Sequence, residues 1–362
     1  MEEKNLKYQE LIQYINNLIA EGALKPGDKL FSENKLADMF DISRQTVRHA
    51  IGILEEEGKV TRIRGSGTYI SDRRSLNLEK RNRIAVVTTY VESYIFPKTI
   101  QGIEKVLFEK GYSVQIAFTN NTVERERNVL EDIISREDVA GVIVEGTKSG
   151  LPNPNIALYK KLQEKKIPIL FINTFYPEIE APHVSLNDVE AAKKAVNYLI
   201  EKGHTQIGAI MKLDDGQGRL RYLGYIQAME AAGLPISDSR MVWIDTDDSK
   251  QLSLCMDKIL SRVEKCTALL CYNDQIAYQL VHLLKERGID VPGRLSLIGI
   301  DDSDLARMCE VPITSLPHPK ENLGAKAAEN LLALIENHKY NATYEFDTRV
   351  VERETVTQTE QE

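Results

Sequence analysis

The sequence predicts a mixed α/β protein in which a small winged helix-turn-helix precedes a larger part made of doubly wound parallel sheets. Residues 1–71 contain three helical patterns followed by a short hairpin pattern. From Ile84 onward, strand patterns alternate with helical patterns, which is typical of parallel sheets flanked by helices. The length of 362 residues agrees with two or three domains.

The N-terminal part begins with an amphipathic helical pattern over residues 8–21, which the breaker residues 26–28 end. A second helix is expected from Ser32. A third follows Ser43, an N-cap candidate, and ends at Gly58, because serine caps helix starts and glycine ends helices. Helix, short turn and helix is the plan of the helix-turn-helix.

The start of the third helix is polar and exposed in this pattern. Residues at the start of a recognition helix reach base edges in the major groove, where arginine pairs with guanine and glutamine with adenine. A solvated helix surface is the alternative interpretation. The candidate DNA-binding residues on this helix are Ser43, Arg44, Gln45, Thr46 and Arg48.

Two short alternating runs after Gly58 surround a glycine-containing loop and predict a β-hairpin, which would be the wing. Glycines at the tip permit close approach of the backbone to a duplex, and arginines supply positive charge. The candidate DNA-binding residues of the wing are Arg62, Arg64, Gly65, Ser66 and Gly67.

The charge distribution supports this interpretation, although the chain has a net charge of −8. Residues 1–83 hold 15 Lys and Arg against 13 Asp and Glu, a net of +2, so the remainder carries −10. Eight basic residues lie within 59–83, where phosphate contact is expected. Residues 72–83 are polar and charged and are predicted to be an interdomain linker, so part of this charge could simply be solvated.

These motifs resemble the GntR family of winged-helix regulators. The matching segments are KPGDKL at 25–30, SENKLA at 32–37, SRQTVR at 43–48, LEEEG at 54–58 and RGSGT at 64–68. The resemblance implies that Asn34 also contacts DNA, together with Ser43, Arg44, Thr46, Arg48 and the wing tip. Phe31 replaces the proline that is usual in the family.

The larger part, residues 84–362, is predicted to form two lobes, with chain crossovers near 185, 305 and 340. Doubly wound lobes bind ligands beyond the carboxyl ends of their strands. Polar, charged and aromatic residues gather at these predicted ends, a mixture that suits a sugar. The candidates from these strand ends are Tyr90, Tyr94, Phe96, Glu145, Lys148, Tyr176, Asn273 and Asp301. Individually, such residues could be helix caps or core.

The larger part resembles the LacI/GalR family, whose effector domain is built like periplasmic sugar-binding proteins. The matching segments are RLRYLGY at 219–225, CYNDQIA at 271–277, GIDVP at 288–292 and SLIGIDD at 296–302. The resemblance implies that Arg221, Asn273 and Asp301 contact sugar hydroxyls, and that His318 lies near another contact. A GntR-like reader fused to such a domain resembles the arabinose-metabolism repressors of Gram-positive bacteria. That resemblance implies L-arabinose as effector, with Glu145 and Lys148 in its pocket.

The sequence therefore predicts a transcriptional repressor whose homodimer binds a pseudo-palindromic operator and releases it when a sugar binds. The alternatives are the same architecture with another pentose or hexose, a corepressor in place of an inducer, a solute-binding protein, or an enzyme. No P-loop, GxSxG, strand-linked GxGxxG or HExxH motif is present, so no enzymatic activity and no cofactor are expected.

The remaining composition predicts a cytoplasmic protein without a membrane partner. No run of about 18 apolar residues occurs, and the N-terminus lacks the pattern of a secretory signal. The four cysteines form no CxxC pair and have no histidine at metal-ligand spacing. Reduced thiols are therefore expected, and a metal site is not.

Overall fold

The computed structural model describes residues 2–63, 66–71, 81–90 and 94–359. The chain divides into two compact units, Met1–Asn82 and Arg83–Glu362. The predicted linker falls largely on residues 72–80, which lie outside the described residues, so its boundaries stay a prediction.

The smaller unit contains three helices, α1 (Glu2–Ala20), α2 (Glu33–Phe40) and α3 (Arg44–Glu56). Ser43 caps its helix as predicted, and Ser32, where the second helix was expected to begin, is also an N-cap. The Ser32 hydroxyl accepts from the backbone N–H of Lys35 at 3.3 Å, and the Ser43 hydroxyl accepts from that of Thr46 at 3.2 Å. Gly58 has a φ of 67° just after α3, which explains why the helix ends there.

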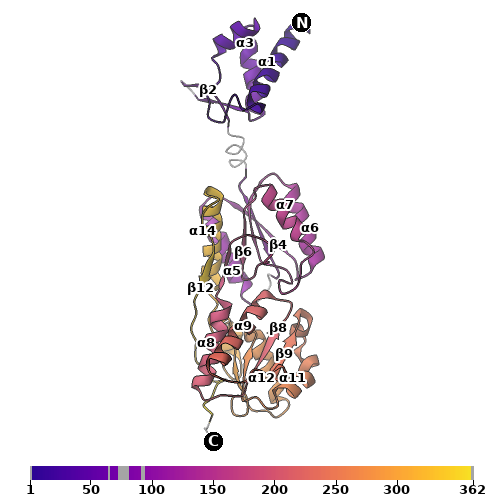
Figure 1. Cartoon of the computed structure of the whole chain (residues 1–362), viewed down its shortest axis with the longest axis vertical. Helices are drawn as coiled ribbons and strands as arrows, with labels where there is room; N and C mark the ends of the chain where they lie inside the picture. Colours follow the sequence, from indigo (N-terminus) through magenta and orange to yellow (C-terminus); the bar gives the residue numbers. More distant parts are fainter. Residues whose placement is uncertain (1, 64–65, 72–80, 91–93, 360–362) are drawn as a thin grey trace. The chain divides into compact units, whose positions relative to one another are not determined.

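An antiparallel hairpin follows, formed by β1 (Val60–Ile63) and β2 (Gly67–Ile70). One face of the hairpin joins the three helices in a single hydrophobic core. The winged helix-turn-helix plan is thus confirmed (Figure 1). The fully enclosed members of the core are Leu11, Ile15, Leu30, Leu36, Val47, Ala50, Ile51, Leu54, Val60 and Ile70.

The larger unit contains two mainly parallel sheets, which we call lobe 1 and lobe 2 with their flanking helices. The lobe 1 sheet has the order β12-β7-β6-β5-β3-β4, and the lobe 2 sheet has the order β11-β10-β8-β9. Every strand pair in both sheets is parallel, which confirms the predicted fold class. The strands are β3 (Arg83–Thr88), β4 (Ser113–Phe118), β5 (Val139–Val144), β6 (Ile169–Ile172), β7 (His183–Leu186), β8 (Ile207–Lys212), β9 (Met241–Ile244), β10 (Ala268–Cys271), β11 (Ser296–Ile298) and β12 (Tyr344–Phe346).

Helices cover both sheets (Figure 1). Lobe 1 carries α5 (Phe96–Glu109), α6 (Val123–Ser135), α7 (Ile156–Glu164) and α14 (Lys320–Glu336). Lobe 2 carries α8 (Asp188–Glu201), α9 (Gly216–Ala231), α11 (Met256–Val263) and α12 (Asp274–Lys285), besides the short α10 (Thr246–Lys250) and α13 (Asp304–Met308) and the 3₁₀ turns Asp238–Arg240 and Leu252–Cys255.

Glycines allow α5 and α14 to cross closely in lobe 1. A Cβ at Gly102 would lie 2.1 Å from the carbonyl oxygen of Glu321, and one at Gly324 would lie 2.0 Å from that of Thr99. No side chain fits at these distances, so the crossing depends on both glycines. The close contact holds α14, which belongs to lobe 1 although it follows the lobe 2 strands in sequence.

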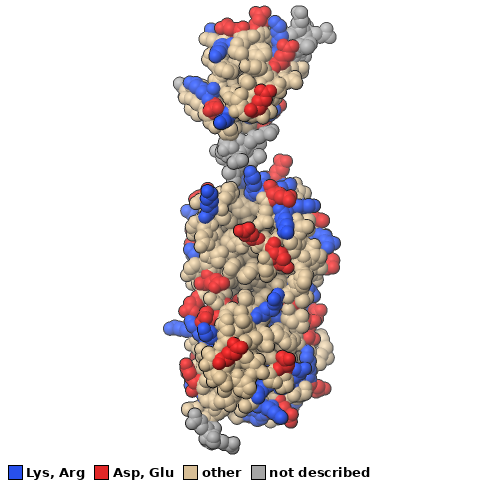
Figure 2. Space-filling view, viewed as in Figure 1, with Lys and Arg blue, Asp and Glu red and all other residues tan. Residues whose placement is uncertain are grey.

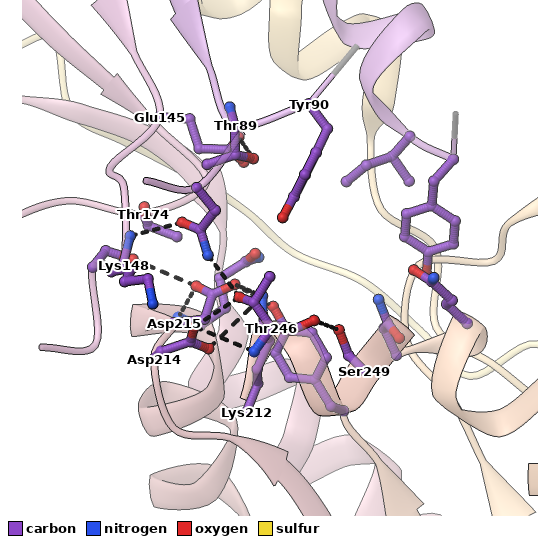
Figure 3. A pocket seen from close by; sticks show the side chains of 18 of the residues that line it. Thr89, Tyr90, Glu145, Lys148, Thr174, Lys212, Asp214, Asp215, Thr246 and Ser249 are labelled. Carbon is purple, nitrogen blue, oxygen red and sulfur yellow. Dashed lines mark hydrogen bonds and ion pairs between the residues drawn. The ribbon is translucent and has the colours of Figure 1, made fainter. Parts of the chain in front are cut away.

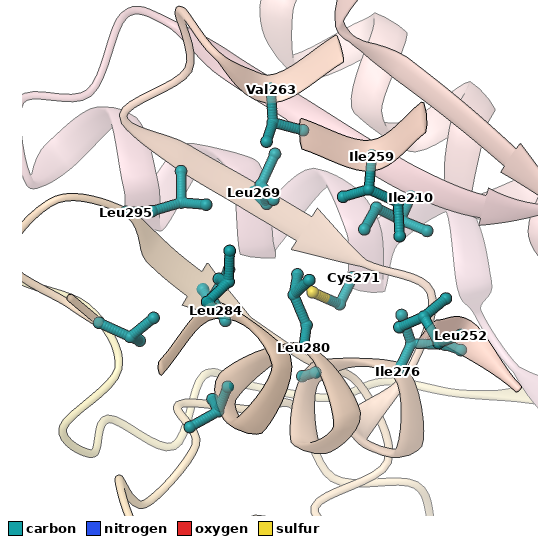
Figure 4. Packing of buried hydrophobic residues seen from close by; sticks show 14 of the residues in the cluster. Ile210, Leu252, Ile259, Val263, Leu269, Cys271, Ile276, Leu280, Leu284 and Leu295 are labelled. Carbon is teal, nitrogen blue, oxygen red and sulfur yellow. The ribbon is translucent and has the colours of Figure 1, made fainter. Parts of the chain in front are cut away.

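The chain passes between the lobes three times, after β7, between β11 and α14, and after β12. Each lobe has its own core, and Figure 4 shows the apolar packing between the lobe 2 strands and α11 and α12. On the face drawn in Figure 2, acidic and basic side chains are interspersed over the larger unit. The net negative charge of this unit is therefore not concentrated on that face.

Candidate functional site: a DNA-reading surface and an interlobe cavity

The start of α3 is a solvent-exposed polar surface. Ser43, Arg44, Gln45 and Arg48 are exposed, and Thr46 is half-buried with its hydroxyl 2.9 Å from that of Ser43. Among the described residues, no hydrogen bond or ion pair holds the guanidinium of Arg44. Its guanidinium is therefore available to a ligand.

Arg48 is held differently from Arg44. Its Nε donates to Glu33 at 2.8 Å, and its backbone carbonyl accepts from the guanidinium of Arg62 at 3.0 Å. Arg62 also pairs with Glu55 at 3.6 Å. These contacts link α2, α3 and the wing, so the three elements present one surface.

The wing tip adds exposed small residues to this surface. Ser66 and Gly67 are exposed, and Gly67 has a φ of 129°, which only glycine adopts easily. Asn34 is exposed in the first turn of α2. Arg64 and Gly65 lie outside the described residues. The assignment of all these residues to DNA stays a prediction.

A cavity of about 250 Å³ lies between the two lobes, at the carboxyl ends of their strands. Seven of the ten candidate effector residues line it, which is where parallel sheets are expected to bind ligands. These seven are Tyr90, Tyr94, Phe96, Glu145, Lys148, Asn273 and Asp301.

Glu145 closes the lobe 1 side of the cavity. Its carboxylate accepts from the backbone N–H of Thr89 at 3.0 Å, from the Thr89 hydroxyl at 2.5 Å and from the Asn173 amide at 2.9 Å. Burial raises the pKa of Glu145 although these donors oppose the shift. The carboxylate therefore has its partners within the protein and serves to shape the wall.

Asp301 closes the lobe 2 side. Its Oδ2 accepts from the Tyr94 hydroxyl at 2.5 Å, across the interlobe gap. Its Oδ1 lies 3.5 Å from the guanidinium of Arg221 and has no closer hydrogen-bond partner among the described residues. Burial raises the pKa of Asp301, and Arg221 opposes that shift. One oxygen of Asp301 is thus available to a ligand.

Three candidates do not line the cavity: Tyr176, Arg221 and His318. Arg221 lies behind Asp301 and donates to Asp188 at 2.7 Å. His318 donates from Nε2 to Asn173 at 3.0 Å and accepts at Nδ1 from the N–H of Lys320, and burial lowers its pKa to about 3. His318 is therefore a neutral imidazole, and it lies behind Asn173 and Glu145 on the lobe 1 side of the cavity.

The sequence analysis missed a group of polar cavity residues. Lys212 ends β8, and Asp214 and Asp215 follow it. Thr246 opens α10, and Asn121 follows β4. Their signal was the polar end of each strand, the same signal that identified Glu145. Figure 3 shows Lys212, Asp214, Asp215 and Thr246 gathered on the side of the cavity opposite Thr89 and Glu145.

Three buried polar atoms of the cavity wall have no hydrogen-bond partner among the described residues: the Tyr90 hydroxyl, Oδ1 of Asp301, and Oδ1 of Asp214, which lies 4.0 Å from the Lys212 ammonium. Tyr90 points into the cavity (Figure 3), and Asp214 accepts at its other oxygen from Thr246 at 2.7 Å. A buried polar atom without a partner costs about 1–3 kcal/mol, so each atom favours a ligand that hydrogen-bonds to it.

Hydrogen bonds from the cavity wall also join the lobes. The Asn121 amide donates to the Thr246 hydroxyl at 2.6 Å, and the backbone N–H of Gly216 donates to the Ser149 hydroxyl at 3.0 Å. With the Tyr94 to Asp301 bond, these contacts stabilise a closed arrangement of lobe 1 on lobe 2.

The winged helix-turn-helix and the two-lobed domain with its interlobe cavity define the class: a two-domain transcription regulator. A model of the gntR family of bacterial regulatory proteins matches residues 7–70, and one of the periplasmic binding protein-like domain matches residues 196–356. A solved transcriptional regulator CelR–cellobiose complex aligns with a TM-score of 0.68 at 22% identity, over 86% of this chain and 90% of that one, which shows the shared fold.

Two curated relatives match along nearly the whole chain. The arabinose metabolism transcriptional repressor of Geobacillus stearothermophilus is 38% identical over 340 residues, 93% of each chain. That of Halalkalibacterium halodurans is 36% identical over 351 residues, 95% of this chain and 93% of its own. The chain belongs to the family of arabinose metabolism transcriptional repressors.

The described residues contain neither a membrane-spanning helix nor a cluster of metal-ligating side chains. None of their helices is long and apolar enough to cross a membrane. Within the same residues, no group of three or more His, Cys, Asp or Glu side chains is placed to hold a metal ion.

Proposed function

We propose that this protein is a cytoplasmic repressor that binds operator DNA as a homodimer and is released when L-arabinose fills the interlobe cavity. The observation that carries the proposal is a pair of buried polar atoms in that cavity, the Tyr90 hydroxyl and Oδ1 of Asp214, for which the described residues supply no hydrogen-bond partner. The names of the two curated relatives support arabinose as the sugar. The proposal includes no catalytic activity.

The charges of the wall favour a neutral polyol over an anion or a cation. Four acidic side chains face three lysines, and most of these groups already have partners. Lys212 lies 3.8 Å from Asp215, and Lys250 lies 2.9 Å from Asp247. Hydroxyl groups both donate and accept, so a sugar satisfies carboxylate oxygens and a phenol together.

Aromatic side chains at one end of the cavity suit the C–H faces of a sugar ring. Phe96 and Tyr90 meet edge to face with their ring centroids 6.2 Å apart, and both line the cavity. Apolar walls with a few fixed polar groups are the usual composition of a small-molecule site.

The DNA part of the proposal depends on the start of α3 and the wing. A single reading helix contacts few base pairs, so a dimer with two readers provides the affinity and length of a usual operator. Exposed Arg44 and Gln45 would contact base edges, while the Ser43 hydroxyl and the wing contact phosphates.

The coupling between sugar binding and operator release follows from thermodynamic linkage. A sugar that binds the closed lobes more tightly than the open lobes shifts the chain toward closure. Operator affinity falls if the closed dimer holds its two DNA-binding units at a spacing that does not match the operator half-sites. Coupling free energies of this kind are typically about 1–3 kcal/mol, or roughly 5- to 150-fold in affinity.

Calorimetry with a panel of pentoses and hexoses tests the sugar, and fluorescence anisotropy with a labelled promoter fragment tests release. We expect L-arabinose to bind and to weaken operator binding. Asp214→Asn should weaken sugar binding by about tenfold or more, since a hydrogen bond to a charged group contributes about 1.5–3 kcal/mol. Asp257→Asn, exposed on α11, is the matched control.

Two outcomes would overturn the proposal. If no sugar of the panel binds, the cavity has been assigned to the wrong ligand class. If L-arabinose binds but operator affinity does not change, the two units are not coupled as proposed.

A further inference from the structure

A buried carboxylate in lobe 1, separate from the cavity wall, has an unusual set of partners. Glu126 on α6 is fully buried, and its four partners are neutral donors. Its Oε1 lies 2.7 Å from the hydroxyls of Tyr159 and Tyr176, and its Oε2 accepts from the amides of Asn153 and Asn155 at 2.8 Å. Such a network is rigid because every partner has a fixed position.

Tyr176 connects this network to the cavity. Its one hydroxyl proton is shared between two acceptors, Oε1 of Glu126 at 2.7 Å and the carbonyl oxygen of Thr147 at 2.8 Å, and its oxygen accepts from the Asn153 amide at 2.7 Å. The Asn153 amide donates to the same Thr147 carbonyl at 3.3 Å. The Tyr176 ring also packs behind Gly146, where an added Cβ would lie 3.3 Å from its Cζ.

Thr147 belongs to the segment 145–150 after β5, which we call the pocket loop. This loop supplies Glu145, Gly146, Lys148 and Ser149 to the cavity wall. Lys148 has a φ of 45°, a conformation that non-glycine residues seldom adopt and that needs support from surrounding contacts. Ser149 accepts the interlobe hydrogen bond from Gly216.

We propose that Tyr176 and Glu126 are positioning residues of the sugar site, which hold the pocket loop through the Thr147 carbonyl without contacting the sugar. This inference rests on the proposed function of the cavity. Glu126 orients the two tyrosine hydroxyls and the two amides, and Tyr176 transmits that order to the loop. Loss of the anchor would let the loop leave the geometry that presents Lys148 to the cavity and Ser149 to lobe 2.

Tyr176→Phe and Tyr159→Phe form a matched pair. Each removes one hydroxyl that lies 2.7 Å from Oε1 of Glu126 and keeps a buried ring, but only Tyr176 reaches the pocket loop. We expect thermal stability to fall in both variants, and further in Tyr176→Phe, whose hydroxyl also has the Asn153 amide and the Thr147 carbonyl as partners. L-arabinose affinity, measured by calorimetry on the full chain, should fall about five- to tenfold for Tyr176→Phe, because this variant loses one hydrogen bond that orders the site. The affinity of Tyr159→Phe should stay within about twofold of that of the unmodified chain.

Hydrogen exchange gives a second readout that a general loss of stability would not reproduce. Amides of the pocket loop should exchange faster in Tyr176→Phe than in Tyr159→Phe, while those of α6 change equally. If Tyr176→Phe does not fold, Asn153→Ala, which removes the other donor to the Thr147 carbonyl, should show the same faster exchange of the loop and the same weaker binding.

The outcomes separate this inference from the proposed function. If the unmodified chain binds no sugar, the proposed function fails. If it binds L-arabinose but the two tyrosine variants have equal affinities and equal loop exchange, the positioning role is wrong.

Discussion

Arg221→Ala removes a guanidinium that joins two buried carboxylates of lobe 2. The guanidinium donates to Asp188 at 2.7 Å and to the carbonyl oxygen of Tyr272 at 2.5 Å, and it lies 3.5 Å from Asp301. The side chains of Arg221, Asp188 and Asp301 are 1%, 0% and 4% exposed. The variant therefore leaves two carboxylates and one carbonyl buried without their partner.

Removing one partner of a buried ion pair costs about 3–5 kcal/mol in unfolding free energy. For a domain of this size, we expect the melting temperature to fall by about 6–15 °C. Sugar binding should fall as well, because Asp301 lines the cavity. Arg219→Ala changes an exposed arginine two residues away on α9 and should leave both quantities unchanged.

The loss of unfolding free energy in Arg221→Ala should also depend on pH, and the pKa values of Asp188 and Asp301 determine the direction of that dependence. Burial already raises the pKa of Asp188 to about 6 against the opposing effect of Arg221. Without Arg221, the pKa values of Asp188 and Asp301 rise further, so the folded variant is stabilised by protonation. Stability held by a raised carboxyl pKa is present at low pH and lost as pH rises. The deficit of Arg221→Ala is thus smaller at pH 5 than at pH 8.

Intrinsic fluorescence reports this unfolding locally, because the single tryptophan, Trp243, lies in β9 of lobe 2. Its ring meets that of Tyr222, the neighbour of Arg221, with centroids 5.0 Å apart. A melting temperature within 2 °C of the unmodified protein, or a deficit that grows as pH falls, would refute the reasoning about the buried ion pair.

Three further predictions concern other parts of the molecule. Because burial lowers the pKa of His318 to about 3, this imidazole should contribute a loss of stability of about 1.4 kcal/mol per pH unit below pH 6.5. In denaturant titrations, His318→Gln should therefore lose less stability on acidification than the unmodified chain, and equal slopes would argue against a neutral buried imidazole. Arg44→Ala should weaken operator binding in anisotropy titrations by about 1–3 kcal/mol and leave sugar affinity intact; unchanged operator affinity would contradict its assignment. Gly150→Ala places a Cβ 2.4 Å from the carbonyl oxygen of Leu213 across the lobe boundary, so calorimetry should show a sugar affinity about tenfold or more lower. Gly216→Ala, whose Cβ would meet no atom closer than 3.4 Å, is the control. Equal affinities of the two variants would mean that sugar binding does not depend on closure of the lobes.

Local signals in the sequence predicted much of the fold. Ser43 and Gly58 mark the ends of α3 because capping depends on neighbouring residues alone. Apolar runs predicted most of the buried strands of both sheets. Short elements with weak patterns were not expected: β7 has four residues and β12 has three, two of them exposed.

The candidate site was predicted less completely, because it is assembled by contacts between distant segments. The strand-end rule placed Tyr90, Glu145 and Asp301 correctly at the cavity. It does not give side-chain direction, and so it treats Tyr176, which points beneath the pocket loop, like Tyr90, which points into the cavity. Asn121 and Thr246 meet only because the lobes close, and no local pattern encodes that contact.

The same wall residues that face the cavity also join the lobes, and this determines how a small ligand can act on the whole domain. Asn121, Ser149 and Tyr94 hydrogen-bond directly to lobe 2, so contacts within the protein contribute to closure beside those that a sugar makes. A ligand shifts the equilibrium only by the difference in its affinity for the closed and open states. That difference comes from atoms such as the Tyr90 hydroxyl and Oδ1 of Asp214, which have no hydrogen bond within the described part of the chain. Because linkage is reciprocal, operator DNA must weaken sugar binding by the same factor by which the sugar weakens operator binding.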